Sequence, residues 1–468
     1  MSIEKEIEKS SGEAHASTGK MISYAIGDIV AYYLLTAYSI YVFYYYEVEV
    51  GLAVSLVALA FIIFAVWNMV NDPLLGYLTD KPLKWTRRWG MRFPWIMIGM
   101  FPTILLYLLI FTVPFDAKTN PWAVFLYMVI ITCLFDTFYS LYYTHFYGTY
   151  TNQFRTDEER RKASLYDNII PGLGVFVLGL IPPLLIVYGD RSTYILAVLI
   201  IAIIMVVCAI FSIPGVSESD ELKEVFIRGY EKAERISFFK TLKTVFKQRN
   251  FVIFIASYVI FTTAYTLYLA SQIYFMKDVL GLPLYYAVYT AIATYIGFII
   301  SIPLWSKVVK KLKNANTYTL SFLIVGLCLL PQLWITTIEE AIIYSFIGGF
   351  GFGCFYYVEM MTLADVNDEV ATVLGKRQES TLLGISMFFE RLSLIFQAII
   401  FALIHILTAY NPDPHAKQTS LAIWGIRIHS ALIPSLLSFI GFIILLKWYD
   451  LKGEKKHAML NKLKDMGL

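Results

Sequence analysis

Charged residues and cysteines are both scarce in this sequence. Asp, Glu, Lys and Arg make up 16% of its 468 residues, whereas an average soluble protein has about 25%. The four cysteines form no CxxC pair and no cluster with histidine, so we expect no disulfide framework, no metal site and no cofactor. No nucleophile and base stand together near a predicted helix end, which argues against an enzyme. The net charge of +3 does not predict a nucleic-acid partner.

Apolar residues are abundant and are arranged in long runs. They make up 58% of the chain, and runs of about 20 residues, enough to cross a bilayer core of about 30 Å, recur from end to end. The strands of a membrane barrel would be shorter and would alternate between polar and apolar residues. The sequence therefore predicts an all-α polytopic membrane protein that lies in the lipid bilayer.

The apolar runs and their flanking charges predict about twelve membrane helices. The predicted spans are 22–46, 52–78, 94–114, 122–148, 168–188, 192–214, 251–276, 284–308, 315–336, 340–364, 380–409 and 425–447.

Basic residues gather in alternate loops, which indicates the cytoplasmic side. The loops in between carry few charges, and we place Glu47 and Glu49 in the first of them. We therefore expect a multi-pass plasma-membrane protein with both termini in the cytoplasm. The basic residues behind this orientation are Lys81, Lys84, Arg87, Arg88, Arg92, Arg155, Arg160, Arg161, Lys162, Lys307, Lys310, Lys311 and Lys313.

The only long polar break lies at 215–250 and divides the chain into two halves of about six helices. We expect it to be a cytoplasmic linker between bundles at 21–214 and 251–450. Residues 1–20 lack the apolar core of a signal peptide, so we expect cytoplasmic tails at 1–20 and 451–468.

The two halves resemble each other at an offset of about 230 residues. FYYYEVEVGL ends the first predicted helix and YFMKDVLGL ends the seventh. The same offset aligns Asp72-Pro73-Leu74 with Ile302-Pro303-Leu304. Parallel repeats of this kind build two-bundle transporters, with the substrate held between the bundles near the middle of the membrane.

Asp72 lies inside an apolar run, where a carboxylate is costly. Burial of a charge at mid-membrane costs roughly 2.5–3.5 kcal/mol, so such a residue is a functional hypothesis by default. Asn68 lies four positions earlier and shares the same helix face. Pro73 removes a backbone donor and frees a carbonyl one turn back. The segment is therefore predicted to bind a coupling cation.

Two stretches are similar to one transporter family. NDPLLGYLTDK (Asn71–Lys81) and LADVNDEVATVLGKRQESTLLGISMFFERLSLIFQA (Leu363–Ala398) resemble the glycoside–pentoside–hexuronide:cation symporters, the melibiose-permease-like branch of the major facilitator superfamily. The resemblance covers nearly the whole chain. It implies a fold of two pseudo-symmetric six-helix bundles and cation-coupled uptake of a sugar or glycoside.

The resemblance also implies roles for particular residues. The family's pair of cation-binding acids matches Asp72 and Asn68, and because the second acid is an amide here we expect H⁺, with Na⁺ as the alternative. The family's sugar-binding acid on the first helix matches Asp28, and its lysine on the eleventh helix matches Arg391, which we expect to pair with Asp28 or with the substrate. The family's arginine at the start of the fifth helix is replaced by Asp167 or Asn168.

Further residues are candidates for the substrate site. Asp136 and Glu359 are intramembrane acids, although either could instead form structural pairs. His145 is a weaker candidate for a proton relay. We expect aromatic contacts to a sugar ring from Tyr32, Tyr147 and Tyr356.

Charged loop residues on the cytoplasmic side form a candidate gate, which pairs across the bundles in one state and separates in the other. Its predicted members are Asp80, Arg87, Arg88, Arg92, Asp365, Asp368 and Arg377.

The sequence as a whole thus predicts a monomeric symporter that works by alternating access on a small molecule, most simply a carbohydrate. A lipid-like or organic-anion substrate is the nearest alternative, because part of the implied sugar-binding set has changed. A receptor or channel is the alternative of another class.

Overall fold

The computed structural model describes residues 16–79, 85–154, 156–220, 223, 243, 245–375 and 379–466. The predicted N-terminal tail up to residue 15, most of the predicted linker, and the gate residues Asp80 and Arg377 lie outside this part of the chain. The described part is made of helices and connecting loops, as the sequence predicts.

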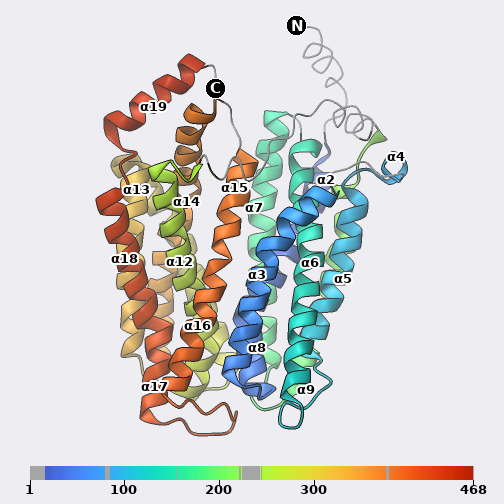
Figure 1. Ribbon diagram of the computed structural model, residues 1–468, viewed down its shortest axis with the longest axis vertical. Helices are drawn as coiled ribbons and strands as arrows, with labels where there is room; N and C mark the ends of the chain where they lie inside the picture. Colours follow the sequence, from blue (N-terminus) through green and yellow to red (C-terminus); the bar gives the residue numbers. More distant parts are fainter. Residues whose placement is uncertain are drawn as a thin grey trace.

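The helices form two bundles side by side (Figure 1). The first contains α2 (Thr18–Tyr44), η1 (Tyr45–Glu49), α3 (Val54–Thr79), α4 (Thr86–Trp89), α5 (Phe93–Phe111), α6 (Pro121–Gln153), α7 (Asp157–Gly179), α8 (Ile181–Leu185) and α9 (Arg191–Val216). The second contains α12 (Arg249–Tyr274), η2 (Phe275–Val279), η3 (Leu284–Tyr286), α13 (Ala287–Leu329), η4 (Leu330–Leu333), α14 (Ile338–Leu374), α15 (Glu379–Glu390), α16 (Leu392–Leu407), α17 (Ser420–Arg427), η5 (Ile428–Leu432), α18 (Ile433–Trp448) and α19 (Gly453–Met466).

Eleven helical stretches of the described chain are long and apolar enough to cross a membrane. One of them, Leu284–Leu333, contains two crossings, because the backbone leaves the helical region at Lys313, where φ is 67°. α13 contacts η3 at its beginning and η4 at its end, and both lie at the end of the molecule that carries α17. Counting the two arms of α13 separately, the described residues contain the twelve predicted crossings.

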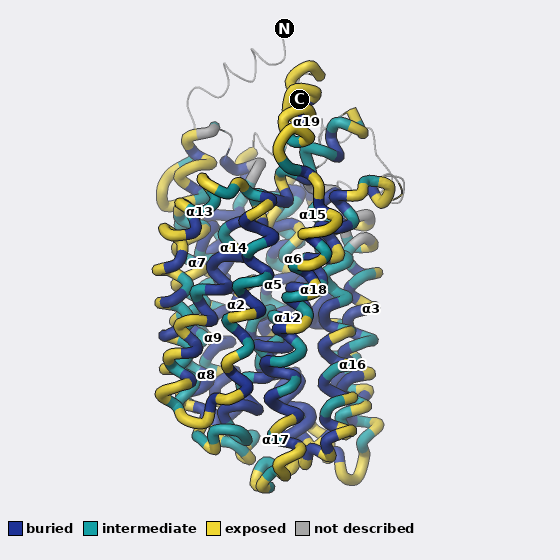
Figure 2. Tube along the Cα trace, turned by 90° about the vertical axis from the view of Figure 1, so that its left-hand side faces the viewer, coloured by how far each residue is buried: buried dark blue, intermediate teal, exposed yellow. Residues whose placement is uncertain are grey.

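α19 and α17 mark opposite ends of the molecule, which we call the α19 end and the α17 end (Figure 1). α19 is the predicted C-terminal tail, and it docks on α14 through Lys456, whose ammonium pairs with Asp365. Most residues of α19 are exposed, whereas buried residues fill the interior of both bundles (Figure 2).

Small residues let neighbouring helices approach closely. A Cβ atom at Gly297 of α13 would lie 2.1 Å from the carbonyl oxygen of Phe346, and one at Gly349 of α14 would lie 2.0 Å from that of Thr294. Glycine at such positions is the usual means of tight helix packing in membranes.

The repeat reappears in the backbone. α2 ends in the π-helical turn η1 and α12 ends in the π-helical turn η2, each five residues long. A glycine with positive φ follows each turn, Gly51 at 76° and Gly281 at 66°. The two joints are separated by the offset that aligns the two halves of the sequence.

The bundles touch mainly towards the α17 end. α16 packs on α3, and α12 packs on α2. The rings of Phe43 and Phe401 lie 4.9 Å apart, as do those of Tyr44 and Tyr274. These contacts close the interface at the α17 end.

Candidate functional site

A buried carboxylate on α6 is held by two amides from α3. The side chains of Asn68 and Asn71 both donate to Asp136, Asn71 at 3.2 Å. They lie three residues apart and so share one face of α3. All three residues are buried. Two donors from one helix therefore fix an acid on its neighbour.

Asp72 faces the other bundle. Its Oδ2 lies 3.9 Å from a terminal nitrogen of Arg391, which stands at the interruption between α15 and α16. The Asp72 side chain is 35% exposed and that of Arg391 is 14% exposed. Asp72 and Arg391 both interact electrostatically with Asp136. The five residues Asn68, Asn71, Asp72, Asp136 and Arg391 form what we call the central cluster.

Three polar atoms of the central cluster are buried without a hydrogen-bond partner: Asn68 Oδ1, Asp72 Oδ1 and Arg391 Nε. Buried polar groups are normally bonded, so such atoms need an explanation, of which a bound ion is one. The two carboxylates and one guanidinium carry a net charge of −1 when ionised. One monovalent cation would neutralise the cluster.

The structure places two of the predicted site residues against partners that the sequence did not name. Arg391 pairs with Asp72 and not with Asp28, the first of its two expected partners, and its pairing with the substrate stays a prediction. Asn68 donates to Asp136, and its cation-binding role beside Asp72 stays a prediction. A shared helix face does not say which neighbouring helix it meets.

Asp28 lies on α2 beside a second acid that the sequence had not singled out for binding. Its electrostatic neighbour is Asp167 of α7, and Asp167 Oδ1 is buried without a partner. Tyr32 and Tyr147 stand on the same side, both near Asp28, and are about half exposed. Tyr139 connects the two regions, because it interacts with Asp28, Asp72 and Arg391.

The acids of the second bundle form a group beside the central cluster, because Glu390 interacts electrostatically with Arg391. Glu359 of α14 neighbours Glu390, and Glu390 interacts with the Tyr258 side chain within the same bundle. Tyr356 lies in an aromatic group with Tyr265, at 5.7 Å between ring centroids. Glu390 thus bonds to Tyr258 and Arg391 pairs with Asp72, although the two adjacent residues also interact electrostatically.

The described gate residues lie at the α19 end. Asp365 accepts from Asn314 at 3.0 Å and pairs with Lys456, both in its own bundle. Arg88 lies over the ring of Trp89, and Arg87 is exposed. Asp368 and Arg92 are both partly buried.

Glu218 anchors the segment that carries Arg92. Its carboxylate accepts the backbone N–H groups of Met91, at 2.5 Å, and Arg92, at 3.0 Å. Burial raises the pKa of this carboxyl.

His145 is buried, and its Nε2 lies 2.7 Å from the hydroxyl of Thr79. It stands near the α19 end of α6, and the ring of Trp95 stacks on it. No contact links it to the central cluster among the bonds of the described residues.

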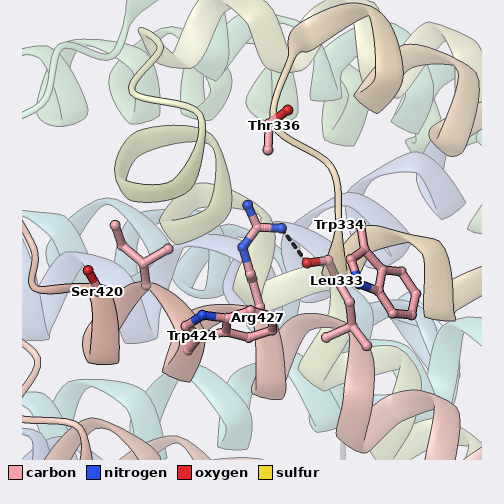
Figure 3. Close-up of a pocket in the computed structure, with 7 residues that line it drawn as sticks. Leu333, Trp334, Thr336, Ser420, Trp424 and Arg427 are labelled. Carbon is pink, nitrogen blue, oxygen red and sulfur yellow. Dashed lines mark hydrogen bonds between the residues drawn. The ribbon is translucent and has the colours of Figure 1, made fainter.

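A cavity of about 350 Å³ opens at the α17 end (Figure 3). Arg427 projects into it beside Trp334 and Trp424, but its guanidinium donates to the backbone carbonyls of Gln332, Leu333 and Ile335. Every residue that lines it belongs to the second bundle. It is therefore distinct from the predicted site between the bundles.

Comparison with models of protein families shows which family the chain belongs to. The model of the family described as MFS/sugar transport protein matches residues 23–453. The chain belongs to this family. It is accordingly a multi-pass membrane protein of a family of small-molecule transporters, and the relatives with named activities are transporters, not enzymes.

Three relatives give the range of similarity. An uncharacterized symporter, sll1374 of Synechocystis, is 29% identical over 122 residues, which are 25% of this chain and 22% of the relative. The sodium-dependent lysophosphatidylcholine symporter 1 of Mus musculus is 28% identical over 41% of this chain and 40% of its own length. The lactose permease of Lactobacillus helveticus is 22% identical over 88% of this chain and 64% of its own length. The chain thus spans less than half the length of the first two.

Among solved structures, that of the nucleoside transporter NupG superposes with a TM-score of 0.62 over 92% of this chain, at 13% identity. This likeness confirms the fold of two helical bundles.

Proposed function

We propose that the protein is a cation-coupled symporter of a sugar or glycoside that works by alternating access, as a monomer in the plasma membrane with both termini in the cytoplasm. The observation that carries the proposal is the buried central cluster, in which Asp72 reaches across the bundle interface to Arg391 and keeps one oxygen without a partner. A charge that joins two moving bundles can change its partner when they move.

The coupling ion we propose is H⁺, taken up by Asp72. Protonation removes the negative charge that holds Arg391 and frees the guanidinium to leave Asp72. The cluster's net charge of −1 matches one proton. Na⁺ is the second candidate, because Asn68 Oδ1 and Asp72 Oδ1 are both oxygen ligands without a hydrogen-bond partner.

The substrate class we propose follows from the acceptors around Asp28. Asp28 and Asp167 are neighbouring acids, and among the residues that the structure describes no positively charged side chain acts on either of them. A polyhydroxylated ligand supplies many O–H donors to such acceptors, whereas an anion would be repelled by them. Half-exposed Tyr32 and Tyr147 could pack against a sugar ring.

A lipid-like substrate remains the second candidate for the cargo. It is favoured by the 26% identity to the sodium-dependent lysophosphatidylcholine symporter 1-A of Danio rerio over 46% of this chain.

The test is transport in proteoliposomes with a panel of labelled sugars, lysophosphatidylcholine and organic anions, driven by an imposed pH gradient or Na⁺ gradient. We expect sugar accumulation under the pH gradient. Accumulation under the Na⁺ gradient alone would replace H⁺ by Na⁺. Movement of lysophosphatidylcholine and of no sugar would overturn the substrate class.

A further inference from the structure

A second buried polar cluster joins the bundles near the α17 end, apart from the central cluster. Each of its side chains is at most 3% exposed. Its members, which we call the far-end cluster, are Glu47 of η1, Ser271 and Tyr274 of α12, His405 of α16 and His429 of η5. The sequence reading placed Glu47 in a loop. That placement is wrong, because η1 extends the first helix by a π turn and buries both Glu47 and Glu49.

Hydrogen bonds connect the far-end cluster into one chain. The Tyr274 hydroxyl donates to Glu47 Oε2 at 2.5 Å, and His405 Nδ1 lies 2.7 Å from Glu47 Oε1. His405 Nε2 lies 3.3 Å from His429 Nε2, and His429 Nδ1 lies 2.7 Å from Ser271 Oγ. Glu47 is the one member from the first bundle, so its bonds to Tyr274 and His405 hold the bundles together.

The position of each proton follows along this chain. The Ser271 hydroxyl donates to the carbonyl of Leu267 at 2.5 Å, so Ser271 Oγ accepts from His429 Nδ1–H. In a neutral His429 ring, Nε2 is then an acceptor, and His405 Nε2–H must donate to it. The remaining bond, between His405 Nδ1 and Glu47 Oε1, needs one further proton. That proton sits on the ring or on the carboxyl; without it, a carboxylate would face an imidazole lone pair at 2.7 Å.

We propose that Glu47 and His405 form a proton-binding site that is loaded when the bundles are closed at the α17 end and releases its proton when that end opens. The proton is the ligand, and the bond it makes is the one that crosses the interface. The proposal rests on the alternating access of the proposed function, but not on the identity of the coupling ion or of the cargo.

Among the described residues, the charged groups on the neighbouring elements already have partners, and the hydroxyls of Tyr44 and Tyr188, which have no hydrogen-bond partner, carry no charge as phenols. The shared proton is therefore the variable charge. Lys277 pairs with Asp278, which also accepts from Tyr410, whose ring stacks on His405. Glu49 accepts from Gly189 N–H and from Tyr194. The other groups on these elements are Tyr44, Tyr188, Arg191, which donates to the carbonyls of Glu49 and Val50, and Arg427, which donates to the carbonyls near η4.

The pH dependence has a definite sign. In the open form both side chains face water, where a glutamate and a histidine hold no shared proton at alkaline pH. At alkaline pH closing therefore takes up one proton, and each further pH unit shifts the ratio of open to closed about tenfold towards open. At mildly acidic pH a histidine in water carries that proton in the open form too, and the ratio is flat.

The experiment measures opening directly, without substrate. Spin labels are placed on the exposed α17-end loops as Lys118→Cys and Lys417→Cys, one on each bundle, after the four native cysteines are replaced by alanine. Pulsed dipolar spectroscopy in Na⁺-free lipid nanodiscs then gives the distance distribution from pH 5 to pH 9. We expect the long-distance population to grow above about pH 6.5, up to tenfold per unit.

Glu47→Gln tests the site. Its amide can bond to both His405 and Tyr274 but takes up no proton, so closing takes up none at alkaline pH and the distances should no longer respond above about pH 6.5. Glu49→Gln is the matched control: it removes a buried acid two residues away whose side-chain bonds stay in the first bundle, and it should respond as the parent does.

Three results would overturn the proposal: a parent distribution that ignores pH, a Glu47→Gln variant that keeps the response, or loss of the response in Glu49→Gln as well. If Glu47→Gln does not fold, His405→Gln carries the same expectation. The two proposals can fail separately. A protein that transports no sugar can still open in response to pH, and a protein whose opening ignores pH can still transport sugar.

Discussion

The central cluster and the far-end cluster both join the two bundles, but their polar atoms are bonded to different degrees. In the central cluster three buried atoms lack a partner, and Asp72 is partly exposed. In the far-end cluster every polar side-chain atom is bonded. Unbonded buried groups cost free energy, so a ligand that bonded to these atoms would stabilise the central cluster. The far-end cluster has all its bonds in the closed form and would lose some of them on opening.

Asp72→Asn gives the largest effect that we expect. An asparagine cannot take up a proton, so accumulation of substrate against its gradient should vanish while exchange of labelled for unlabelled substrate persists. Uptake and exchange in the same proteoliposomes measure the two. Asp413→Asn removes an exposed carboxylate at the α17 end and should leave both intact. Gradient-driven accumulation by Asp72→Asn would move the coupling site elsewhere.

Arg391→Gln should reduce uptake by at least roughly 30-fold, because it removes the positive charge that acts on the buried Asp136, and loss of one partner of a buried charge pair costs about 2–5 kcal/mol. Arg391→Lys should keep most of the rate, since a single nitrogen of the guanidinium approaches Asp72 and a point charge can replace it. Initial uptake rates compare the two variants. Equal losses in both would show that the fork of the guanidinium, and not its charge alone, is needed.

Tyr274→Phe tests the far-end cluster through stability. It leaves Glu47 Oε2 buried without its donor, which costs about 1–3 kcal/mol. Tyr46→Phe is the control, because its hydroxyl donates to the carbonyl of Ile110 inside one bundle, a neutral bond worth about 0.5–1.5 kcal/mol. Thermal unfolding in detergent should show the lower midpoint for Tyr274→Phe; the reverse order would contradict a cluster that holds the bundles together.

Asn71→Ala should have the smallest effect. Asp136 keeps the bond from Asn68 and loses the one from Asn71, so the cation concentration for half-maximal uptake should change by about tenfold or less, as loss of one bond to a charged group predicts. Asn168→Ala, which removes an exposed amide that bonds within its own helix, should not change it. An Asn71→Ala variant as inactive as Asp72→Asn would make Asp136 the coupling acid.

The sequence shows which residues are candidates for a function better than it shows which residues they contact. Asp72 is recognisable because an acid in an apolar run is costly, and Asn68 because it shares that helix face. Neither observation says that Asn68 and Asn71 meet Asp136, or that Arg391 meets Asp72 and not Asp28, because these contacts depend on how α3 packs against α6 and α16.

Part of the far-end cluster could have been predicted from the sequence, and part could not. His405 and His429 are ionisable residues inside predicted spans 380–409 and 425–447, so the reasoning applied to Asp72 would have found them. Glu47 could not be found in this way. It follows the predicted end of the first helix, and only the π turn η1 shows that the segment continues far enough to bury it.

The reversal at Lys313 has a consequence for biosynthesis. A single residue with φ of 67° joins the two arms of α13, which leaves no loop to hold them apart. The eighth and ninth crossings must then enter the bilayer together as a helical hairpin, so that neither arm has an independent topology during insertion.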